Sequence, residues 1–159
     1  MNALIRPALH SDIPAILTLM QEFYAGEHIV YEPRRAEAGL TELIRNQKFG
    51  LAHVVLVHDN PAGYFIVTFG FSLEFHGRFA LLDELYINEA CRGEGLGGRC
   101  LTFVEDFCRS EGIGALRLEV ESANDRARTL YRKTGFMEHD RRLMTKWMRT
   151  DQRRKQDVG

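Results

Sequence analysis

The chain has 159 residues, of which 45% are hydrophobic and 27% are charged, a balance typical of a globular domain that buries one core. Lysine and arginine total 21 against 22 aspartate and glutamate residues, and this formal charge of -1 argues against a general nucleic-acid or membrane-surface role. No apolar run approaches the ~20 residues of a spanning helix, and the first ten residues lack a secretory-signal pattern, so we expect a cytoplasmic protein.

The sequence predicts one domain over residues 1–148, followed by a charged tail over 149–159 that we expect to be disordered. Cysteines stand at Cys91, Cys100 and Cys108, at spacings that fit neither a disulfide framework nor a zinc motif. The six histidines are scattered and form no pair that would place two imidazoles on one helical face. We therefore expect reduced thiols and no metal site.

Hydrophobic periodicity predicts a short strand and two helices in the first fifty residues. The strand spans residues 3–6, and a helix follows that begins at Ser11 or Asp12 and carries one apolar face. A second helix begins at Pro33 and ends near Gly50.

Three strands follow, separated by turn residues. They are predicted over 52–58, 64–75 and 79–88, and their short connections allow an antiparallel meander. A helix is then expected from Leu96 to near Gly112, a fourth strand of the sheet over 116–121, and a short helix that ends at Gly135. Residues 143–148 are predicted to form a last strand.

The segment Arg92–Gly98 reads RGEGLGG and lies between a predicted strand and a predicted helix. Glycines in that setting let backbone amides approach a phosphate, and the helix N-terminus adds a favourable dipole. The alternatives are a plain flexible turn and a dinucleotide motif, Gly-x-Gly-x-x-Gly, with Glu119 as the ribose-binding acid. The antiparallel strands before the loop and the short chain after it argue against the dinucleotide alternative.

Three motifs then occur in register: Leu85-Tyr86-Ile87, Arg92-x-x-Gly95-x-Gly97, and Asn124-x-x-Ala127-x-x-Leu130-Tyr131-x-x-x-Gly135-Phe136. In order and spacing this pattern resembles the GNAT superfamily of acyl-CoA-dependent N-acyltransferases. The resemblance implies an α/β fold with a mixed, mostly antiparallel central sheet flanked by helices. It also implies acetyl-CoA as co-substrate and direct transfer to an amine in a ternary complex.

The resemblance further implies where acetyl-CoA binds. Amides of the glycine-rich loop hold the pyrophosphate, the preceding strand splays from its neighbour to admit the pantetheine arm, and the Ile87 amide binds the thioester carbonyl oxygen. Glu94 departs from the family pattern, so we expect its carboxylate to turn outward. The implied coenzyme-binding residues are Leu85, Tyr86, Ile87, Arg92, Gly93, Glu94, Gly95, Leu96, Gly97, Gly98 and Asn124.

Two residues are candidate catalysts. A lysine-type amine has a pKa near ~10.4 and must lose a proton before it attacks. The resemblance assigns this base role to Glu84, whose structural alternative is a salt bridge. It assigns protonation of the departing thiolate to Tyr131, whose structural alternative is a core aromatic. Because side chains alternate along a strand, we expect only one of Asp83 and Glu84 to face the cleft.

The resemblance implies that the acceptor site is built from the segment between the first two helices and from the long central strands. Acidic and aromatic side chains in that segment suit a cationic amine. We predict that the acceptor is a primary amine of the diamine or polyamine kind. The alternative acceptors are a protein lysine and a protein N-terminal amine. The alternative functions of the chain are a nicotinamide-dependent oxidoreductase and a non-catalytic acyl-CoA sensor. The resemblance also allows a homodimer. The predicted acceptor-binding residues are Tyr24, Glu27, His28, Tyr31 and Glu32.

Overall fold

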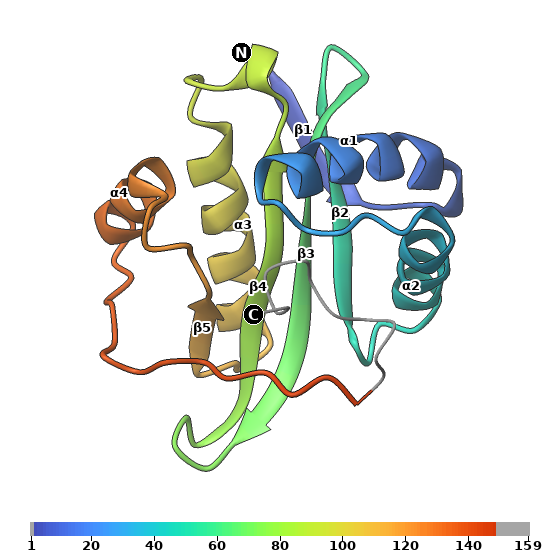
Figure 1. Cartoon of the computed structure of the whole chain (residues 1–159). Helices are drawn as coiled ribbons and strands as arrows, with labels where there is room; N and C mark the ends of the chain where they lie inside the picture. The colour runs from blue at the N-terminus through green and yellow to red at the C-terminus, as the bar shows by residue number, and fades with distance from the viewer. Residues whose placement is uncertain (1, 149–159) are drawn as a thin grey trace.

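The structure is a computed structural model that describes residues 2–148 (Figure 1). Within this range five strands alternate with helices, and two short 3-10 turns, η1 (His10–Asp12) and η2 (Glu89–Cys91), precede α1 and α3. The strands are β1 (Ala3–Pro7), β2 (Gly50–Val57), β3 (Asn60–Ser72), β4 (Gly77–Ile87) and β5 (Ala115–Leu118). The helices are α1 (Ile13–Gly26), α2 (Pro33–Arg45), α3 (Leu96–Ser110) and α4 (Asp125–Lys133).

The strands form one sheet in the order β1-β2-β3-β4-β5. The first four run antiparallel, and β5 pairs parallel to β4. The turn between β2 and β3 has His58 and Asp59 at φ 49° and 62°, the conformation that two-residue hairpins favour because it matches the strand twist. The predicted meander and the mixed, mostly antiparallel sheet are therefore confirmed.

Helices α1 and α2 pack on one face of the sheet, and α3 and α4 pack on the other (Figure 1). Strand β3 contributes side chains to the hydrophobic cores on both faces of the sheet. Its residues Tyr64 and Ile66 belong to the core under α1 and α2, whereas Phe65 and Val67 belong to the core over α3. The sequence indicated only the second of these apolar faces, and the tyrosine on the first face proves important for the site.

Two predicted strands end earlier than expected. Strand β3 stops at Ser72, and Leu73 beyond it is 86% exposed in the hairpin that leads to β4. Strand β5 stops at Leu118. The predicted strand over 143–148 is wrong: this segment crosses in front of the sheet instead of lying along its edge, so its backbone cannot continue the ladder (Figure 1).

The charged tail predicted over 149–159 lies outside the described residues. Among residues 2–148, no helix has the length and apolar character needed to cross a membrane.

Candidate active site

A wedge opens between β4 and β5. Strand β5 pairs with β4 only at the β4 residues from Phe79 to Leu82, whereas β3 pairs with β4 as far as Ile87. The amide of Asn88 donates to the carbonyl of Ala62 on the β3 side at 2.8 Å. Because successive peptide groups point to opposite neighbours, the Ile87 amide points away from β3 and toward the wedge. An acyl carbonyl in the wedge would meet this donor.

The glycine-rich loop lies where β4 leads into α3. Gly95 is the N-cap of α3 at φ 74°, and Gly93 before it has φ 90°. A Cβ built on either glycine would meet nothing within 4 Å, so the outer side of the loop is open. Backbone amides at the start of a helix favour an anion there. The loop therefore fits the pyrophosphate of a coenzyme.

Side chains around the loop make contacts within the protein. The Arg92 Nε donates to the carbonyl of Ile87 at 2.8 Å, and its guanidinium pairs with Glu89 at 3.3 Å and stacks over the Tyr86 ring at 5.3 Å. Leu96 is only 3% exposed, whereas Glu94 is exposed. This arrangement ties the loop to the end of β4 and leaves phosphate binding mainly to backbone amides.

An irregularity in β4 places two carboxylates together. Glu84 lies opposite Ile66 and Leu82 opposite Val67, so the strand register skips Asp83 between them, which is the pattern of a β-bulge. Strict alternation is lost at a bulge, and both Asp83 and Glu84 line the same cavity. The expectation that only one of them faces the cleft is therefore wrong.

The carboxylate of Glu84 is held by two tyrosines. Its Oε1 accepts from the Tyr24 hydroxyl at 2.6 Å and its Oε2 accepts from the Tyr64 hydroxyl at 2.7 Å. Burial raises the pKa of Glu84 above its usual value, and the two hydrogen bonds oppose that rise only in part. Burial and the Glu84 charge likewise raise the pKa of Tyr64, which stays protonated as a donor. Glu84 is thus a fixed carboxylate with increased basicity.

The cavity beside Glu84 has a volume of about 420 Å³ and lies between α1, α2 and the face of β3 and β4. Its walls are largely apolar residues of these elements, which sets the charged groups in a partly dehydrated environment. Its polar and aromatic lining residues are Tyr24, Glu32, Arg35, Thr68, Asp83, Glu84 and Trp147. This lining suits a positively charged ligand with an apolar part.

A larger cavity of about 590 Å³ lies at the β1–β2 side of the sheet, between the ends of α2 and α3. It contains His53, which is buried against Phe65 and Phe103, and burial lowers the pKa of His53 to about 4. None of the lining residues belongs to β4 or to the glycine-rich loop. The smaller cavity is therefore the one placed to receive an acceptor.

Residues 13–136 match the family model for the Acetyltransferase (GNAT) family. The chain belongs to the GNAT family. Its activity is therefore that of an acetyl-transferring enzyme, in a family that uses acetyl-CoA.

Three proteins illustrate the relationship. An uncharacterized N-acetyltransferase of Bacillus subtilis, YhfO, is 28% identical over 136 residues, which cover 84% of this chain and 89% of the relative. Thialysine N-epsilon-acetyltransferase of Bos taurus is 28% identical over 144 residues, which cover 83% and 82%. The crystal structure of a predicted acetyltransferase from Clostridium acetobutylicum with acetyl-CoA has a TM-score of 0.78 at 16% identity, with 91% and 96% coverage. This last likeness shows the shared fold.

Tyr131, the GNAT candidate for the acid, lies on α4 and packs edge-on against Phe136 with ring centroids 5.7 Å apart. Burial, with a smaller effect of the Glu27 charge, raises the pKa of Tyr131, so its hydroxyl keeps its proton at neutral pH. The acid role of Tyr131 stays a prediction.

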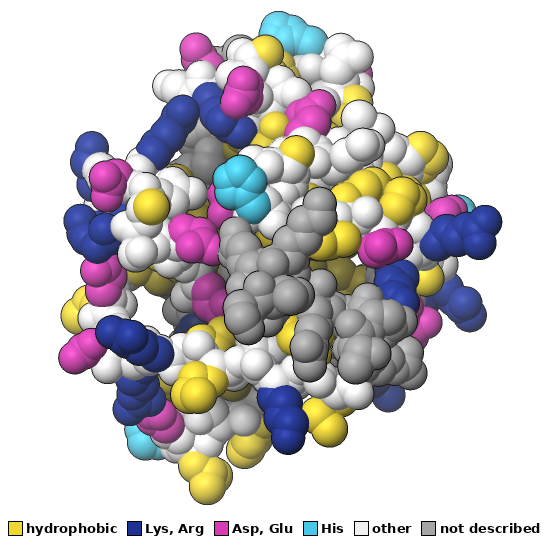
Figure 2. All heavy atoms as spheres, in the orientation of Figure 1, with side chains coloured by type: hydrophobic (Ala, Val, Ile, Leu, Met, Phe, Trp, Pro, Cys, Tyr) yellow, Lys and Arg dark blue, Asp and Glu magenta, His cyan; other side chains and the backbone are white. Residues whose placement is uncertain are grey.

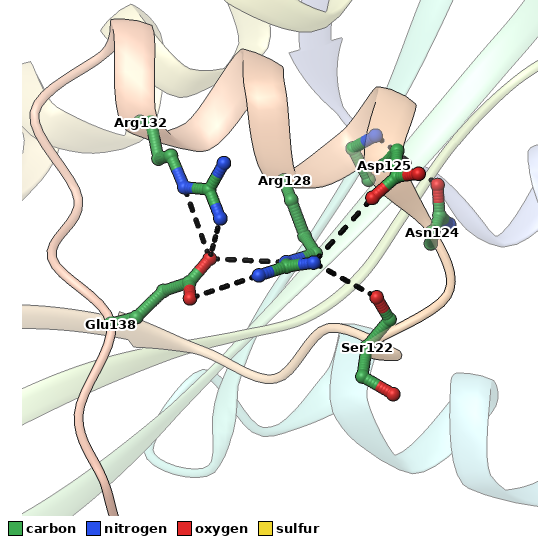
Figure 3. Close-up of polar contacts among 7 residues, drawn as sticks. Ser122, Asn124, Asp125, Arg128, Arg132 and Glu138 are labelled. Atoms are coloured by element: carbon green, nitrogen blue, oxygen red, sulfur yellow. Dashed lines mark hydrogen bonds and ion pairs between the residues drawn. The ribbon is translucent and has the colours of Figure 1, made fainter.

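Helix α4, which carries Tyr131, is fixed by a polar network (Figure 3). Arg128 donates to both carboxylate oxygens of Glu138 at 3.0 and 3.1 Å and to the carbonyl of Ser122 at 3.0 Å. Arg132 donates to the same carboxylate at 2.7 Å. Asn124 caps the helix by accepting from the Ala127 amide at 3.1 Å. The predicted contact between Asn124 and the coenzyme stays a prediction.

The predicted acceptor residues divide into two groups. Tyr24 and Glu32 line the cavity, whereas Glu27, His28 and Tyr31 are not among its lining residues. The Tyr31 hydroxyl donates to the carbonyl of Leu17 at 3.2 Å, and its ring packs edge-on against Tyr24 at 6.0 Å. Tyr31 therefore supports a lining residue rather than the cavity itself.

Three contributors to the site lay outside the predicted set. Tyr64 shares the strand face of Ile66 and Thr68, so simple alternation along β3 could have found it. The bulge that turns Asp83 into the cavity has no sequence signal, and Trp147 gave none either. Within the described part of the chain, no group of three His, Cys, Asp or Glu side chains is arranged to hold a metal ion.

Proposed function

We propose that this enzyme transfers an acetyl group from acetyl-CoA to a primary amine of a small cationic molecule of the diamine or polyamine kind. The observation that carries the proposal is the lining of the cavity beside Glu84, which holds the carboxylates of Asp83, Glu84 and Glu32, the N-cap residue of α2, against one guanidinium, that of Arg35. A second ammonium on the acceptor would be attracted by this acidic lining, which would repel an acidic acceptor.

Acetyl-CoA supplies a reactive acetyl thioester. The amides of the loop between Arg92 and Gly98 would hold its pyrophosphate, and the wedge beside β4 would take the pantetheine arm. The Ile87 amide is directed into that wedge, where it can donate to the carbonyl oxygen and stabilise the charge that develops on it.

Glu84 would take a proton from the acceptor ammonium. The tyrosine hydroxyls fix its carboxylate, so the base does not need to reorient, and burial brings its pKa closer to working pH. Asp83 is exposed at the bulge and lines the same cavity, where its carboxylate would attract the remaining positive charge of the acceptor. Tyr131 would return a proton to the coenzyme thiolate.

Two further observations support a cationic acceptor. The Bos taurus relative is named for acetylation at an ε-nitrogen, which makes a side-chain amine of a small molecule a natural comparison. Figure 2 shows acidic and basic side chains on the face bearing α1 and α2, with several Lys and Arg side chains toward its edges. In the cavity itself a cationic acceptor would meet three carboxylates, those of Glu32, Asp83 and Glu84, against one guanidinium, that of Arg35.

The test is release of coenzyme A thiol from acetyl-CoA with a panel of acceptors. The panel holds diaminoalkanes, monoamines of equal length, amino acids, and peptides that offer either a lysine or a free N-terminus. We expect the highest kcat/KM with a diamine, and a fall in kcat/KM as salt screens the attraction. A preference for peptides or for monoamines, or a salt-independent kcat/KM, would contradict the proposed acceptor class.

A further inference from the structure

The chain continues beyond α4 as an extended segment, residues 138–148, which we call the strap. In Figure 1 the strap passes in front of β5, β4 and β3 toward α2. It has no regular secondary structure. Its position therefore depends on side-chain contacts rather than on sheet hydrogen bonds.

Two ionic contacts hold the strap. At its start, the Glu138 carboxylate accepts hydrogen bonds from the guanidinium groups of Arg128 and Arg132 on α4, and the shortest nitrogen–oxygen distance is 2.7 Å (Figure 3). Further along, Arg141 pairs with Glu74 in the β3–β4 hairpin at 2.8 Å. The first contact joins the strap to the helix that carries Tyr131, and the second sets its course across the sheet.

Near its end the strap contributes one side chain to the acceptor cavity. Trp147 lines that cavity and is partly buried. Its neighbours on the strap differ: Met144 is 91% exposed and Met148 is 85% exposed. An indole that shares a cavity with Tyr24, Asp83 and Glu84 offers an aromatic face to any cation those carboxylates attract.

We propose that Trp147 is a specificity-determining residue of the acceptor site, whose indole packs against the alkyl chain and the ammonium of a cationic amine. This inference rests on the proposed function, because it names a further recognition element of the same cavity. The acceptor class it fits is a primary amine with a second positive charge a few carbon atoms away. A monoamine of equal length carries only the ammonium that must lose its proton to react, so it gains the apolar contact without a second positive charge for the cation–π attraction.

The chain contains one tryptophan, so its fluorescence reports on Trp147 alone. We expect 1,4-diaminobutane to change the emission of the wild-type protein saturably, with a midpoint close to its KM in the turnover assay. Butylamine should produce a smaller change at equal concentration. Unchanged emission at a diamine concentration that saturates turnover would overturn the proposal.

Kinetics of Trp147→Leu and Trp147→Phe provide the second measurement, with Met144→Leu as the matched control on the same strap. A cation–π contact corresponds to roughly a 2- to 30-fold change in affinity. We expect Trp147→Leu to raise KM for the diamine by that factor, Trp147→Phe to raise it less, and KM for acetyl-CoA to stay at the wild-type value. Equal KM values for Trp147→Leu and Met144→Leu would contradict the inference.

The outcomes separate the two proposals. If diamines are acetylated well but Trp147→Leu leaves their KM unchanged, the role of Trp147 fails and the proposed function stands. If no amine in the panel releases thiol, the proposed function fails, and a saturable effect of the diamine on Trp147 emission would still support the binding role. Loss of melting temperature in Trp147→Leu beyond that of Trp147→Phe would assign the residue to packing instead.

Discussion

Replacing Glu84 with glutamine separates its catalytic role from its structural role. Glutamine has the same shape, and its amide can accept from one of Tyr24 and Tyr64 while donating to the other hydroxyl oxygen. The side chain therefore stays in place but can no longer take a proton. A positioned base contributes typically about 100- to 10,000-fold, so kcat of Glu84→Gln should fall by that factor with acetyl-CoA binding unchanged.

The same substitution should change how stability depends on pH. Because burial raises the pKa of Glu84, the folded protein binds more protons than the unfolded chain between the usual carboxyl pKa and the raised value. The free energy of unfolding contributed by this group is then present at low pH and is lost as pH rises through that window. Glutamine lacks this ionisation, so the melting temperature of Glu84→Gln relative to wild type should rise between pH 4 and pH 8.

The size of this effect follows from the competing contacts. Each tenfold change in proton affinity corresponds to about 1.4 kcal/mol, and 1 kcal/mol moves the melting temperature of a chain of this size by about 2–4 °C. The hydrogen bonds from Tyr24 and Tyr64 to a charged acceptor are stronger than those to an amide, which offsets part of the gain. The relative melting temperature should therefore shift by a few degrees, and its sign is the informative result.

The assays are thiol release over a pH series and thermal melting at the same pH values. Glu22→Gln is the matched control, because Glu22 is also held by a tyrosine, with the Tyr86 hydroxyl at 2.9 Å, yet it does not line the cavity. The control should retain kcat within about threefold. Full activity of Glu84→Gln, or a relative melting temperature that falls from pH 4 to pH 8, would refute the assignment of Glu84 as a buried base.

Three further outcomes are expected. Gly95→Ala and Gly112→Ala both place a Cβ at positive φ (74° and 65°), so each should cost about 1–2 kcal/mol of stability. Calorimetry should show weaker acetyl-CoA binding only for Gly95→Ala, and equal affinities of the two variants would exclude the loop as the pyrophosphate site. Tyr131→Phe should lower kcat at an unchanged melting temperature, since the ring contact with Phe136 survives, and near wild-type turnover would remove Tyr131 from the mechanism. Glu138→Gln should cost no more than about 1 kcal/mol of stability, because the ion pairs of Glu138 are solvent-exposed. It should nevertheless raise KM for the amine, because it weakens the contact between the strap and α4, and an unchanged KM would show that the position of the strap does not depend on this contact.

Regular features of the chain were predictable because local rules decide them. Apolar spacing located α1 and α3, and Pro33 at the start of α2 marked its first turn. The loop from Arg92 to Gly98 was also visible, since glycine is the residue type that adopts the positive φ found at two of its positions. The loop proposed to hold the coenzyme pyrophosphate could accordingly be located from the sequence, and its contacts with the coenzyme stay a prediction.

The acceptor half could not be predicted in the same way, because it depends on contacts between distant segments. Tyr24 and Tyr64 come from a helix and a strand far apart in the chain, and only the packed fold brings both hydroxyls to Glu84. Trp147 reaches the cavity through a segment that the sequence analysis predicted to be a strand. A short apolar segment forms a strand only where it pairs with a neighbouring strand, and this pairing depends on the fold rather than on the segment itself.

The bulge in β4 connects the two halves of the site. Leu82 is the last β4 residue paired with β5, and the extra residue, Asp83, follows it directly. A bulge bends the strand and increases its local twist, which moves the rest of β4 away from the line of β5 and favours the wedge that would admit the coenzyme. The same residue breaks the alternation of side chains, so that Asp83 and Glu84 both reach the acceptor cavity. One inserted residue in β4 therefore accounts for both the wedge and the adjacent carboxylates in the cavity, which is the juxtaposition that the proposed acetyl transfer to a cationic amine requires.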